Sequence, residues 1–411
     1  MTLTLNVWYD GDLIGFLRYD RHSRLLFSYD RGRRTDPPPR PISHSFPAGH
    51  RHSPTDLCLP YFEGLLPDGA RRSRAAAALG TTWDDTLRLL AGLGAEVAGA
   101  LTLLPAREDP VSGSGRAVRP LSKDELIRIL EVGEDRLRLS LAGTRSKLPV
   151  VLVDGRPALP AEGQVTTHVL KPAIPDMEWT TENEAYSMRL AARVGLEVAP
   201  IRIGVVDGRK YLIIKRYDRE EVRGGSVRRL HQEDFCQALG VLPEVKYASD
   251  GGPGFARCFS LIRETCTFPA IGVLKLLDAA IFQVIIGNAD AHAGSYSLLW
   301  RQSGEVALAP LRDLMSTVSY PELRGRFAME IAGRGTLEEM RAGDWGRFAK
   351  RCGLGAPFVR RRVGELCKWA IWVSDSVAAE LASPGLSEEA LMRLAGLVKG
   401  RAQRLRRGVP K

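Results

Sequence analysis

Residues 285–317 read IIGNADAHAGSYSLLWRQSGEVALAPLRDLMST and place two aspartates at opposite ends of a short β-rich pattern. An apolar run leads to Asp290, and a short loop then reaches the strand-like SLLW. The polar turn RQSGE separates this strand from VALAPL, and Asp313 follows. This order predicts a β-hairpin flanked by two carboxylates. Phosphoryl transfer uses a base near the acceptor hydroxyl and oxygen ligands that hold magnesium against the phosphates, and two aspartates suit these roles.

Length and composition indicate a large globular protein. The chain has 411 residues, of which 44% are hydrophobic and 26% charged, so it can bury an extensive interior. This length favours two or three domains and excludes a small module held together by disulfides or zinc. The net charge is +10, from 58 basic and 48 acidic residues. That excess suits a polyanionic partner such as DNA, RNA or ATP, and it fits a solvated arginine-rich surface equally well.

The cysteines and the amino terminus favour a cytoplasmic protein. Six cysteines occur without a CxxC pair and without the spacing of metal ligands, so we expect reduced core residues. The start, MTLTLNVWYDGDL, has neither a basic segment nor the apolar run of a signal peptide. No run approaches the roughly 18 apolar residues that a membrane span requires, and we expect no membrane association.

The amino-terminal half contains two β-rich sections. The first thirty residues alternate apolar and polar around Asp10-Gly11, which predicts an antiparallel meander. A proline-rich loop, TDPPPRPIS, and helical patterns follow, and residues 106–120 have the Gly, Ser and Pro content of a linker. The second section opens at RLRLSLAG and turns at Asp154-Gly155 and Asp207-Gly208. These patterns predict two separate β-rich regions.

Helical patterns begin between these strands and dominate the rest of the chain. Ser122 with Glu125, and Thr181 with Glu184, match the capping box that starts a helix. From about residue 230 the pattern is overwhelmingly helical. We therefore expect an α+β fold with domains at 1–108, 120–228 and 229–411. A β-rich part followed by an α-rich part that carries the candidate site is typical of a two-lobed enzyme.

Two segments of the second β section could bind phosphate. SLAGTRSK, residues 140–147, is a small-residue loop with two cations, although a glycine between strands is more often a plain turn. Lys171 ends the apolar strand THVLK, where a buried ammonium is costly unless an anion meets it. Glu184 could pair with such a lysine, as a helix glutamate does in kinases, or serve only in its capping box.

Two further segments allow a functional and a structural interpretation. His292 could orient the loop or touch phosphate, and a hydrogen-bonded core histidine is the more frequent case. KRYDRE, residues 215–220, could connect two lobes where backbone groups meet adenine, or it could be a charged strand end.

Together these segments resemble the HipA-type serine/threonine kinases, which are toxins of bacterial toxin–antitoxin modules. The resemblance spans almost the whole chain and rests on eight segments in the family's order. They are YFEGLLPDG, SLAGTRSK, HVLKP, ENEAYSMRLAARVGL, LIIKRYDR, HQEDFCQALG, IIGNADAHAGSYSLL and LAPLRDLMST. The resemblance implies a two-lobed kinase-like fold with an amino-terminal β-rich subdomain and an all-α carboxy-terminal lobe.

The resemblance also implies ATP, Mg²⁺ and a set of site residues. Asp290 would accept the proton, Asp313 and Ser295 would hold magnesium, and Ser140 would be the autophosphorylated serine. The remaining ATP-binding positions would be Ala142, Gly143, Thr144, Arg145, Ser146, Lys147, Lys171, Lys215, Arg216, Tyr217, His292, Ser295 and Arg312. A phosphate on Ser140 would expel the phosphate loop by repulsion.

The chain departs from the family pattern at three places. Gly294 and Ser295 stand where the family has a lysine and a metal-binding asparagine, the phosphate loop reads TRSK in place of AQEK, and Lys215 replaces an acid. A serine hydroxyl is a shorter oxygen ligand than an asparagine amide. We therefore expect ATP binding with slower turnover.

Two functions follow from the resemblance. The first is a kinase toxin that phosphorylates a component of translation, such as an aminoacyl-tRNA synthetase, and thereby arrests growth. The second is a nucleotide-binding co-repressor with little activity that binds operator DNA together with a HipB-like helix-turn-helix antitoxin. Basic segments such as FVRRRVG and VKGRAQRLRRGVPK are compatible with both functions, because a protein that contacts DNA phosphates binds in a salt-dependent way.

Overall fold

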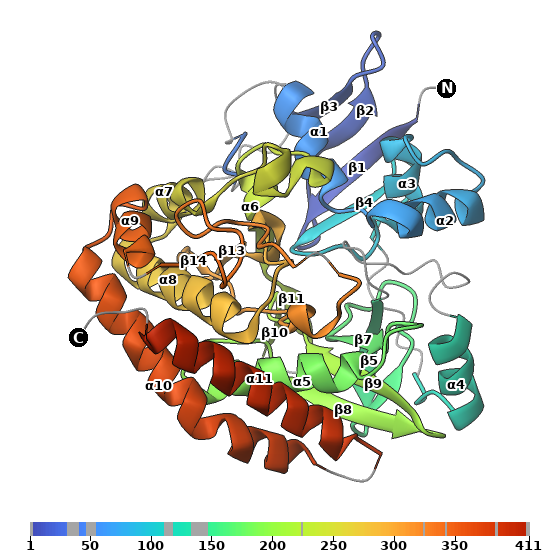
Figure 1. Ribbon diagram of the computed structural model, residues 1–411. Coiled ribbons are helices and arrows are strands. Elements are labelled where there is room, and N and C mark those ends of the chain that lie inside the picture. Colours follow the sequence, from blue (N-terminus) through green and yellow to red (C-terminus); the bar gives the residue numbers. More distant parts are fainter. Residues whose placement is uncertain are drawn as a thin grey trace. The chain divides into compact units, whose positions relative to one another are not determined.

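The computed structural model forms two compact units (Figure 1). It describes residues 3–30, 41–46, 55–110, 118–132, 147–222, 225–323, 325–341, 343–382 and 385–407. The first unit comprises Met1–Pro172, Ile213–Glu244 and Leu299–Glu305, and the second comprises Ala173–Leu212, Val245–Leu298 and Val306–Lys411. Helices and strands are both present, as the α+β prediction requires. The structure does not test the three domain boundaries, which stay predictions.

A four-stranded antiparallel sheet begins the first unit. Its strands are β1 (Thr4–Tyr9), β2 (Asp12–Tyr19), β3 (Leu25–Tyr29) and β4 (Leu101–Pro105), in the order β3-β2-β1-β4. The turn between β1 and β2 is Asp10-Gly11, so the predicted hairpin is confirmed. Gly15 lies where β2 approaches β3 closely, because an added Cβ would come within 2.4 Å of the Ser28 carbonyl oxygen.

One face of this sheet is buried under helices of the same unit. Alternate residues such as Leu5, Val7 and Phe27 are fully buried, as the two-residue period of a strand dictates. Tyr61 and Phe62 from α1 join them in one aromatic core. The helices of this unit are α1 (Thr55–Glu63), α2 (Gly69–Leu79), α3 (Thr86–Leu93), α4 (Lys123–Val132) and α6 (Phe235–Ala238).

The remaining strands build three further sheets. They are β5 (Leu148–Val153), β6 (Arg156–Ala158), β7 (His168–Pro172), β8 (Ile201–Val206), β9 (Arg209–Lys215), β10 (Arg219–Glu221), β11 (Val227–Arg229), β12 (His231–Asp234), β13 (Ser297–Trp300) and β14 (Val306–Leu308). A five-stranded sheet has the order β6-β5-β7-β9-β8, a three-stranded sheet the order β12-β13-β14, and β10 pairs with β11. The predicted turns at Asp154-Gly155 and Asp207-Gly208 are confirmed, because each joins two neighbouring strands.

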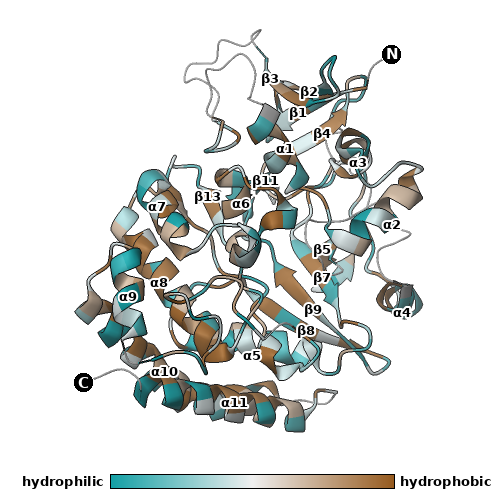
Figure 2. Cartoon of the chain, turned by 45° about the horizontal axis from the view of Figure 1, so that its top comes forward, coloured by the Kyte–Doolittle hydropathy of each residue, from teal (hydrophilic) through white to brown (hydrophobic). Residues whose placement is uncertain are grey.

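Helices dominate the second unit. They are α5 (Thr180–Arg193), α7 (Phe255–Thr265), α8 (Pro269–Ile286), α9 (Asp344–Arg351), α10 (Ala356–Leu381) and α11 (Glu388–Arg407). The long helices α10 and α11 lie side by side (Figure 1). Along α11 the buried residues recur every three or four positions, and Figure 2 shows the resulting mixture of hydrophilic and hydrophobic residues.

Helix α8 forms part of the interior of this unit. By length and composition it could cross a membrane, but 67% of the residues in its 18-residue apolar window are buried inside the protein. Such burial is typical of the core helix of a soluble protein. Lys275 and Asp278 interrupt the apolar run of α8, so this segment does not stand out in the sequence as a possible membrane span.

The two predicted capping boxes have different outcomes. At α4 the box is confirmed, because the Ser122 amide donates to Glu125 at 2.8 Å and the Glu125 amide donates to the Ser122 hydroxyl at 3.2 Å. At α5 the prediction is wrong. This helix already begins at Thr180, its N-cap residue is Trp179, and Thr181 lies inside the helix.

The six cysteines are all free and buried, as predicted.

Candidate functional site

The loop that carries Asp290 follows directly from the end of α8. Gly287 ends the helix in a left-handed conformation with φ 71°, and its amide donates to carbonyls of the last helical turn. A Cβ at this position would lie 2.3 Å from Val318, so only glycine fits. The Asn288 side chain then accepts the Asp290 amide at 3.0 Å. These contacts fix the backbone that presents Asp290.

A tyrosine hydroxyl meets the carboxylate of Asp290. Tyr247 donates to Oδ1 of Asp290 at 2.6 Å, and its ring packs edge-to-face against His292 with ring centroids 5.4 Å apart. Asp290 and His292 are both half-buried. The carboxylate is thus held by a hydrogen bond and remains partly accessible to solvent.

His292 and Ser295 bound a short 3-10 turn within the same loop. The Ser295 amide donates to the His292 carbonyl at 2.9 Å, and β13 begins two residues later at Ser297. Ser295 is half-buried. Asp290, His292 and Ser295 therefore belong to one loop of the second unit, as the sequence predicted.

Arg312 and Asp313 follow β14 in the second unit. Asp313 adopts a left-handed backbone with φ 57°, which is uncommon for a residue other than glycine and is found at functional positions. Arg312 Nη1 lies 2.6 Å from Oδ2 of Asp313, and 23% of the Asp313 side chain is exposed. The neighbouring Leu311 is anchored by backbone hydrogen bonds to Glu197 and Ala199, both at 2.9 Å.

Hydrogen bonds tie the Asp290 loop to the segment that follows Asp313. The Ala289 amide donates to the Thr317 hydroxyl at 2.7 Å, and the Val318 amide donates to the Gly287 carbonyl at 3.1 Å. The residues immediately before Asp290 are therefore connected to a position four residues after Asp313. The two predicted carboxylates lie on linked segments of one unit.

Asn183 of α5 fixes this segment from its other side. Its side-chain amide donates to the Ser316 carbonyl at 3.0 Å, while its carbonyl oxygen accepts the Ser316 amide at 2.7 Å. Asn183 is only 1% exposed, and Ser316 is fully buried. This two-sided backbone contact holds the Asp313 segment as a strand partner would.

The donor atoms of this region suit magnesium. Aspartate carboxylates and a serine hydroxyl are hard oxygen ligands, which Mg²⁺ prefers. Among the described residues, no three His, Cys, Asp or Glu side chains gather in a way that could hold a metal ion. Magnesium at kinase sites takes one or two carboxylates and completes its shell with phosphates and water, so Asp313 and Ser295 fit the ion.

In the first unit, two predicted phosphate ligands lie on neighbouring strands. β5 pairs with β7 in antiparallel register, with Leu148 opposite Leu170. The next positions outward are Lys147 and Lys171, so the two lysines stand next to each other at one end of the strand pair. Lys171 is only 3% exposed and Lys147 is half-buried.

The predicted hinge residues of the first unit have different surroundings. Lys215 is exposed and lies 3.4 Å from Glu221, and the Tyr217 hydroxyl donates to Gln232. Arg216 instead points into the interior, where it contacts Glu96 at 2.6 Å and Asp218 at 2.8 Å. Its nitrogens also donate to Thr166 and to the Val97 carbonyl. A nucleotide contact of Arg216 would therefore fall to its backbone.

Glu96 is the centre of this buried cluster of charges. It accepts from Arg216, Arg219 and Arg229 at 2.6–2.7 Å, and from Thr166 at 2.8 Å. Burial alone would raise the pKa of Glu96, but the three guanidinium groups outweigh it and lower that pKa to about 2. The cluster gives Arg216 and Arg219 a structural role.

Some predicted residues cannot be placed and some contributors were missed. Ser140, Ala142, Gly143, Thr144, Arg145 and Ser146 lie outside the described residues. Glu184 is placed within α5 and is 2% exposed. Tyr247 was not predicted, because it lies in an aperiodic segment without a local signal. Asn183 was not predicted either, although it directly precedes Glu184.

Comparisons with known proteins cover nearly the whole chain. Residues 139–372 match the model of the HipA-like C-terminal domain, and residues 5–104 match that of the HipA N-terminal domain. Y4mE of Sinorhizobium fredii is 45% identical over 98% of both chains. The serine/threonine-protein kinase toxin HipA of Shewanella oneidensis is 28% identical over 80% of this chain and 79% of that protein.

A solved structure shows the same fold. It is the complex of the Shewanella oneidensis toxin HipA with HipB and operator DNA, and it matches with a TM-score of 0.85. The alignment covers 97% of each chain at 24% identity. These matches agree with the resemblance that the eight sequence segments indicated. The chain belongs to the HipA family and has the HipA fold.

Proposed function

We propose that this protein is a serine/threonine protein kinase that uses ATP and Mg²⁺. Its biological role in this proposal is that of a toxin that phosphorylates a translation component, such as an aminoacyl-tRNA synthetase. The observation that carries the proposal is the 2.6 Å hydrogen bond from the Tyr247 hydroxyl to Asp290. A carboxylate that accepts a hydrogen bond from a hydroxyl at this distance has the geometry that a general base needs toward an acceptor serine.

Seven of the predicted residues have a role in this mechanism. Asp290 orients the acceptor hydroxyl and receives its proton, while Lys147 and Lys171 bind phosphate oxygens. Asp313 and Ser295 would hold Mg²⁺, and His292 and Arg312 would line the nucleotide site. Bound Mg²⁺ would neutralise the phosphate charge during transfer. Catalysis would depend mostly on positioning, which the hydrogen bonds among residues 183, 287, 289, 316, 317 and 318 support.

Autophosphorylation would regulate the same site. Ser140 precedes the predicted phosphate loop, Ala142–Lys147, in the sequence. A phosphate on Ser140 would carry up to two negative charges beside residues that must bind phosphate, and repulsion would prevent ATP from binding. This regulation predicts that Ser140→Ala removes the incorporated label and extends the active lifetime of the enzyme. Mass spectrometry of the labelled chain identifies the modified residue.

Incorporation of label from radioactive ATP tests the proposed kinase. Wild type is compared with Asp290→Asn and with the control Asp375→Asn, which changes an exposed acid on α10. We expect a loss of about 100-fold or more in Asp290→Asn, the scale of a lost general base, and unchanged labelling in the control. Equal background labelling in all three proteins would exclude the kinase.

A second candidate function is that of a co-repressor. The HipA chain in the solved complex is assembled with HipB and operator DNA, and the present chain carries a net charge of +10. We infer a HipB-like helix-turn-helix partner that reads the bases while this chain contacts phosphates. A gel-shift titration with a small helix-turn-helix protein encoded beside it tests this function. An operator affinity that this chain does not raise would contradict it.

A further inference from the structure

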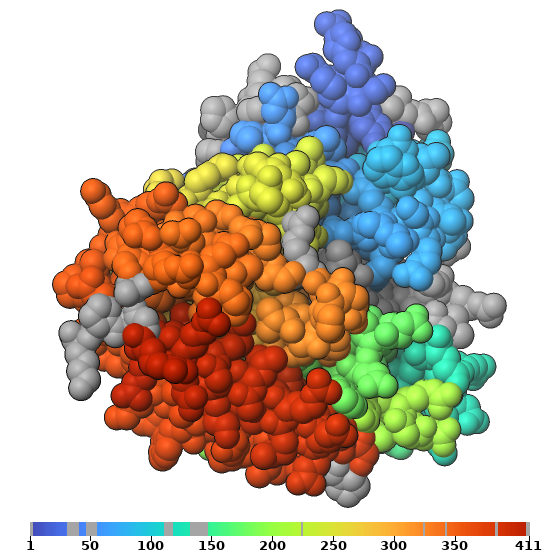
Figure 3. Space-filling view, in the orientation of Figure 1, coloured from blue at the N-terminus to red at the C-terminus, as the bar shows by residue number. Residues whose placement is uncertain are grey.

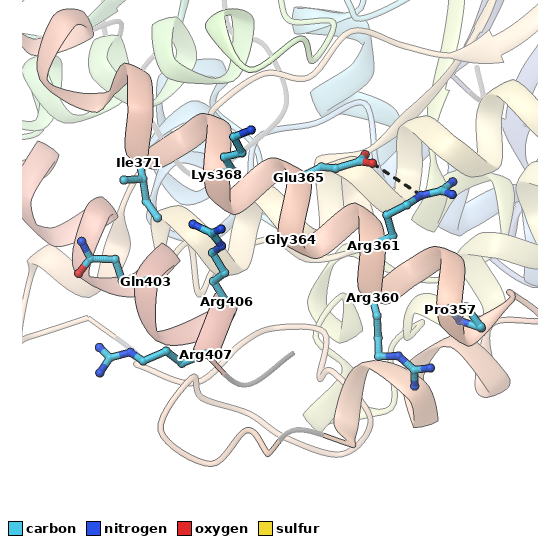
Figure 4. Close-up of a pocket in the computed structure, with 10 residues that line it drawn as sticks. All are labelled: Pro357, Arg360, Arg361, Gly364, Glu365, Lys368, Ile371, Gln403, Arg406 and Arg407. Carbon is cyan, nitrogen blue, oxygen red and sulfur yellow. Dashed lines mark ion pairs between the residues drawn. The ribbon is translucent and has the colours of Figure 1, made fainter. Parts of the chain in front are cut away.

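The carboxy-terminal helices form a groove away from the residues of the proposed kinase site. It has a volume of about 870 Å³ and lies between the first half of α10 and the end of α11 (Figure 4). Its walls are formed by Pro357, Arg360, Arg361, Gly364, Glu365, Lys368, Ile371, Gln403, Arg406 and Arg407. The α10 residues recur every three or four positions and thus form one face of the helix. Both helices are exposed at the surface of their unit (Figure 3).

Positive charge dominates this groove. Five of its residues are basic and one is acidic, and Glu365 is already paired with Arg361 at 3.6 Å and with Arg362 at 3.0 Å. Within the described part of the chain, Arg360, Lys368, Arg406 and Arg407 form no ion pair. Like charges that face one another repel, and an anionic partner that spans the groove would relieve this repulsion.

Exposed aromatic rings border the basic groove along α10. Trp369 is 46% exposed and Trp372 is 73% exposed, and their rings pack in a T-shaped pair with centroids 5.1 Å apart. The two tryptophans directly follow the groove residues Lys368 and Ile371 in the sequence. Phe358 is 37% exposed, and the Arg361 guanidinium lies 5.5 Å from the centre of its ring. Large apolar side chains gathered at the surface mark an interaction site.

The combination of charges and rings selects one kind of partner. Phosphates of any nucleic acid would suit the cations, but a base can stack on an indole ring only when it is outside a duplex. Carboxylates of an acidic peptide would pair with the cations only, whereas every nucleotide of a single strand has both a phosphate for the cations and a base that can stack on a tryptophan. We propose that the α10–α11 groove binds single-stranded nucleic acid, with its backbone along the cations and its bases against Trp369 and Trp372.

Fluorescence anisotropy of labelled oligonucleotides of about 12 nucleotides, a length within the range of known single-strand sites, tests this proposal. The full chain is titrated with oligo(U), oligo(dT) and a duplex of the same length. We expect oligo(U) or oligo(dT) to bind more tightly than the duplex. Each neutralised phosphate contributes about 0.7 to the slope of log K against log salt, so several contacts would give a steep dependence.

Two sets of variants separate the parts of the groove. Arg360→Glu with Lys368→Glu should weaken single-strand binding about tenfold or more. The control is Arg202→Glu with Arg257→Glu, on β8 and α7, which changes the net charge by the same amount and should leave single-strand binding unchanged. Trp369→Ala with Trp372→Ala should weaken it about tenfold, the scale of one stacked base. If charge reversal unfolds the chain, Arg360→Gln with Lys368→Gln replaces it and still weakens binding severalfold.

Three results would overturn the proposal. The first is a duplex affinity equal to that of the single strand and unaffected by the tryptophan substitutions. The second is an equal loss of binding in the control pair, which would indicate a nonspecific effect of net charge. The third is binding of polyglutamate in the absence of any oligonucleotide binding, which would assign the groove to an acidic protein. Kinase activity enters none of these measurements, so the groove is tested independently of the proposed function.

Discussion

Two groups of charged residues, one in each unit of this protein, have opposite surroundings. In the first unit, Glu96, Arg216, Asp218 and Arg219 are almost completely buried and form ion pairs with one another. In the second unit, Asp290 and Asp313 lie in loops and remain partly exposed. Their backbones are fixed by Asn183, Thr317 and the end of α8. The backbones of these two aspartates are fixed and their carboxylates are accessible, so the carboxylates can bind a ligand or substrate.

This difference distinguishes structural from functional charges. A buried charge whose partners all belong to the chain contributes to the fold, and removal of one partner leaves the others uncompensated. A partly exposed carboxylate on a fixed loop adds little to stability, so its substitution should affect activity first. Unfolding measurements and activity measurements should therefore respond to different residues.

The largest expected effect on stability is in the buried cluster. Glu96→Gln removes the negative charge that three guanidinium groups share, and we expect the free energy of unfolding to fall by about 3–5 kcal/mol. Urea denaturation followed by circular dichroism measures this change. Glu125→Gln is the matched control, because Glu125 pairs with the exposed Arg119 at the surface. A similar, small effect of both substitutions would contradict the structural role of the cluster.

A second effect on stability comes from a buried carboxyl group without a cation. Glu233 accepts hydrogen bonds from the Ser43 hydroxyl at 2.7 Å and the His44 amide at 2.8 Å, no described residue forms an ion pair with it, and burial raises its pKa to about 8. The folded protein therefore holds a proton that the unfolded chain has released above its usual pKa of about 4.5. The contribution of Glu233 to the free energy of unfolding is therefore greatest below the usual pKa of about 4.5, and it is lost as the pH rises toward 8.

Replacement of Glu233 tests this linkage. Between pH 5 and pH 8 we expect the free energy of unfolding of wild type to fall by on the order of 3 kcal/mol relative to Glu233→Gln. Urea unfolding at several pH values gives both curves. His231 also titrates in the folded protein, with a pKa lowered to about 4 by burial, and it is common to both proteins. Parallel curves would show that Glu233 is ionised in the fold.

A smaller effect, on activity alone, is expected at Tyr247. Tyr247→Phe removes the hydroxyl that positions Asp290, and a hydrogen bond to a charged group contributes about 1.5 kcal/mol. We expect kcat/KM for phosphoryl transfer to fall about tenfold with almost unchanged stability. Tyr19→Phe serves as the control, because its hydroxyl contacts Asp85 in the amino-terminal sheet region. An unchanged kcat/KM would mean that Tyr247 does not position the base.

The sequence allowed prediction of the features that depend on local chemistry. The three Asp-Gly pairs predicted as turns, at residues 10–11, 154–155 and 207–208, each produced the expected hairpin, because a tight turn needs residues that tolerate a positive φ. The capping box at Ser122 formed as well, since all its partners lie within one helical turn. Short, continuous motifs also allowed three further predictions. These are the loop of Asp290, the position of Lys171 at a strand end and the membership of the HipA family.

Features that depend on long-range packing could not be predicted. Glu96 meets Arg216 and Arg219 across more than a hundred residues, so the hinge segment gave no indication that its arginines point inward. Tyr247 reaches Asp290 from an irregular segment. At α5, Thr181 matched a capping box but lies inside a helix that begins earlier, at Thr180. In each case tertiary contacts outweighed the local pattern.

The smallest expected effect concerns the serine that replaces a family asparagine. Asparagine offers an amide oxygen on a longer side chain than serine, and such oxygens are good magnesium ligands. We therefore expect Ser295→Asn to raise turnover or to lower the magnesium concentration for half-maximal activity, by roughly threefold, which corresponds to about 0.7 kcal/mol. Titration of the kinase assay with MgCl₂ measures both quantities.

The control for this gain is Ser303→Asn. It makes the same chemical change in the exposed turn between β13 and β14, outside the Asp290 loop. A gain in turnover or magnesium affinity at Ser295 alone would support the distinction between structural and functional residues. One better oxygen ligand would then improve a site whose backbone is already fixed. No change in turnover or in magnesium dependence would mean that the ion is held by other groups, and Ser295 would lose its assigned role.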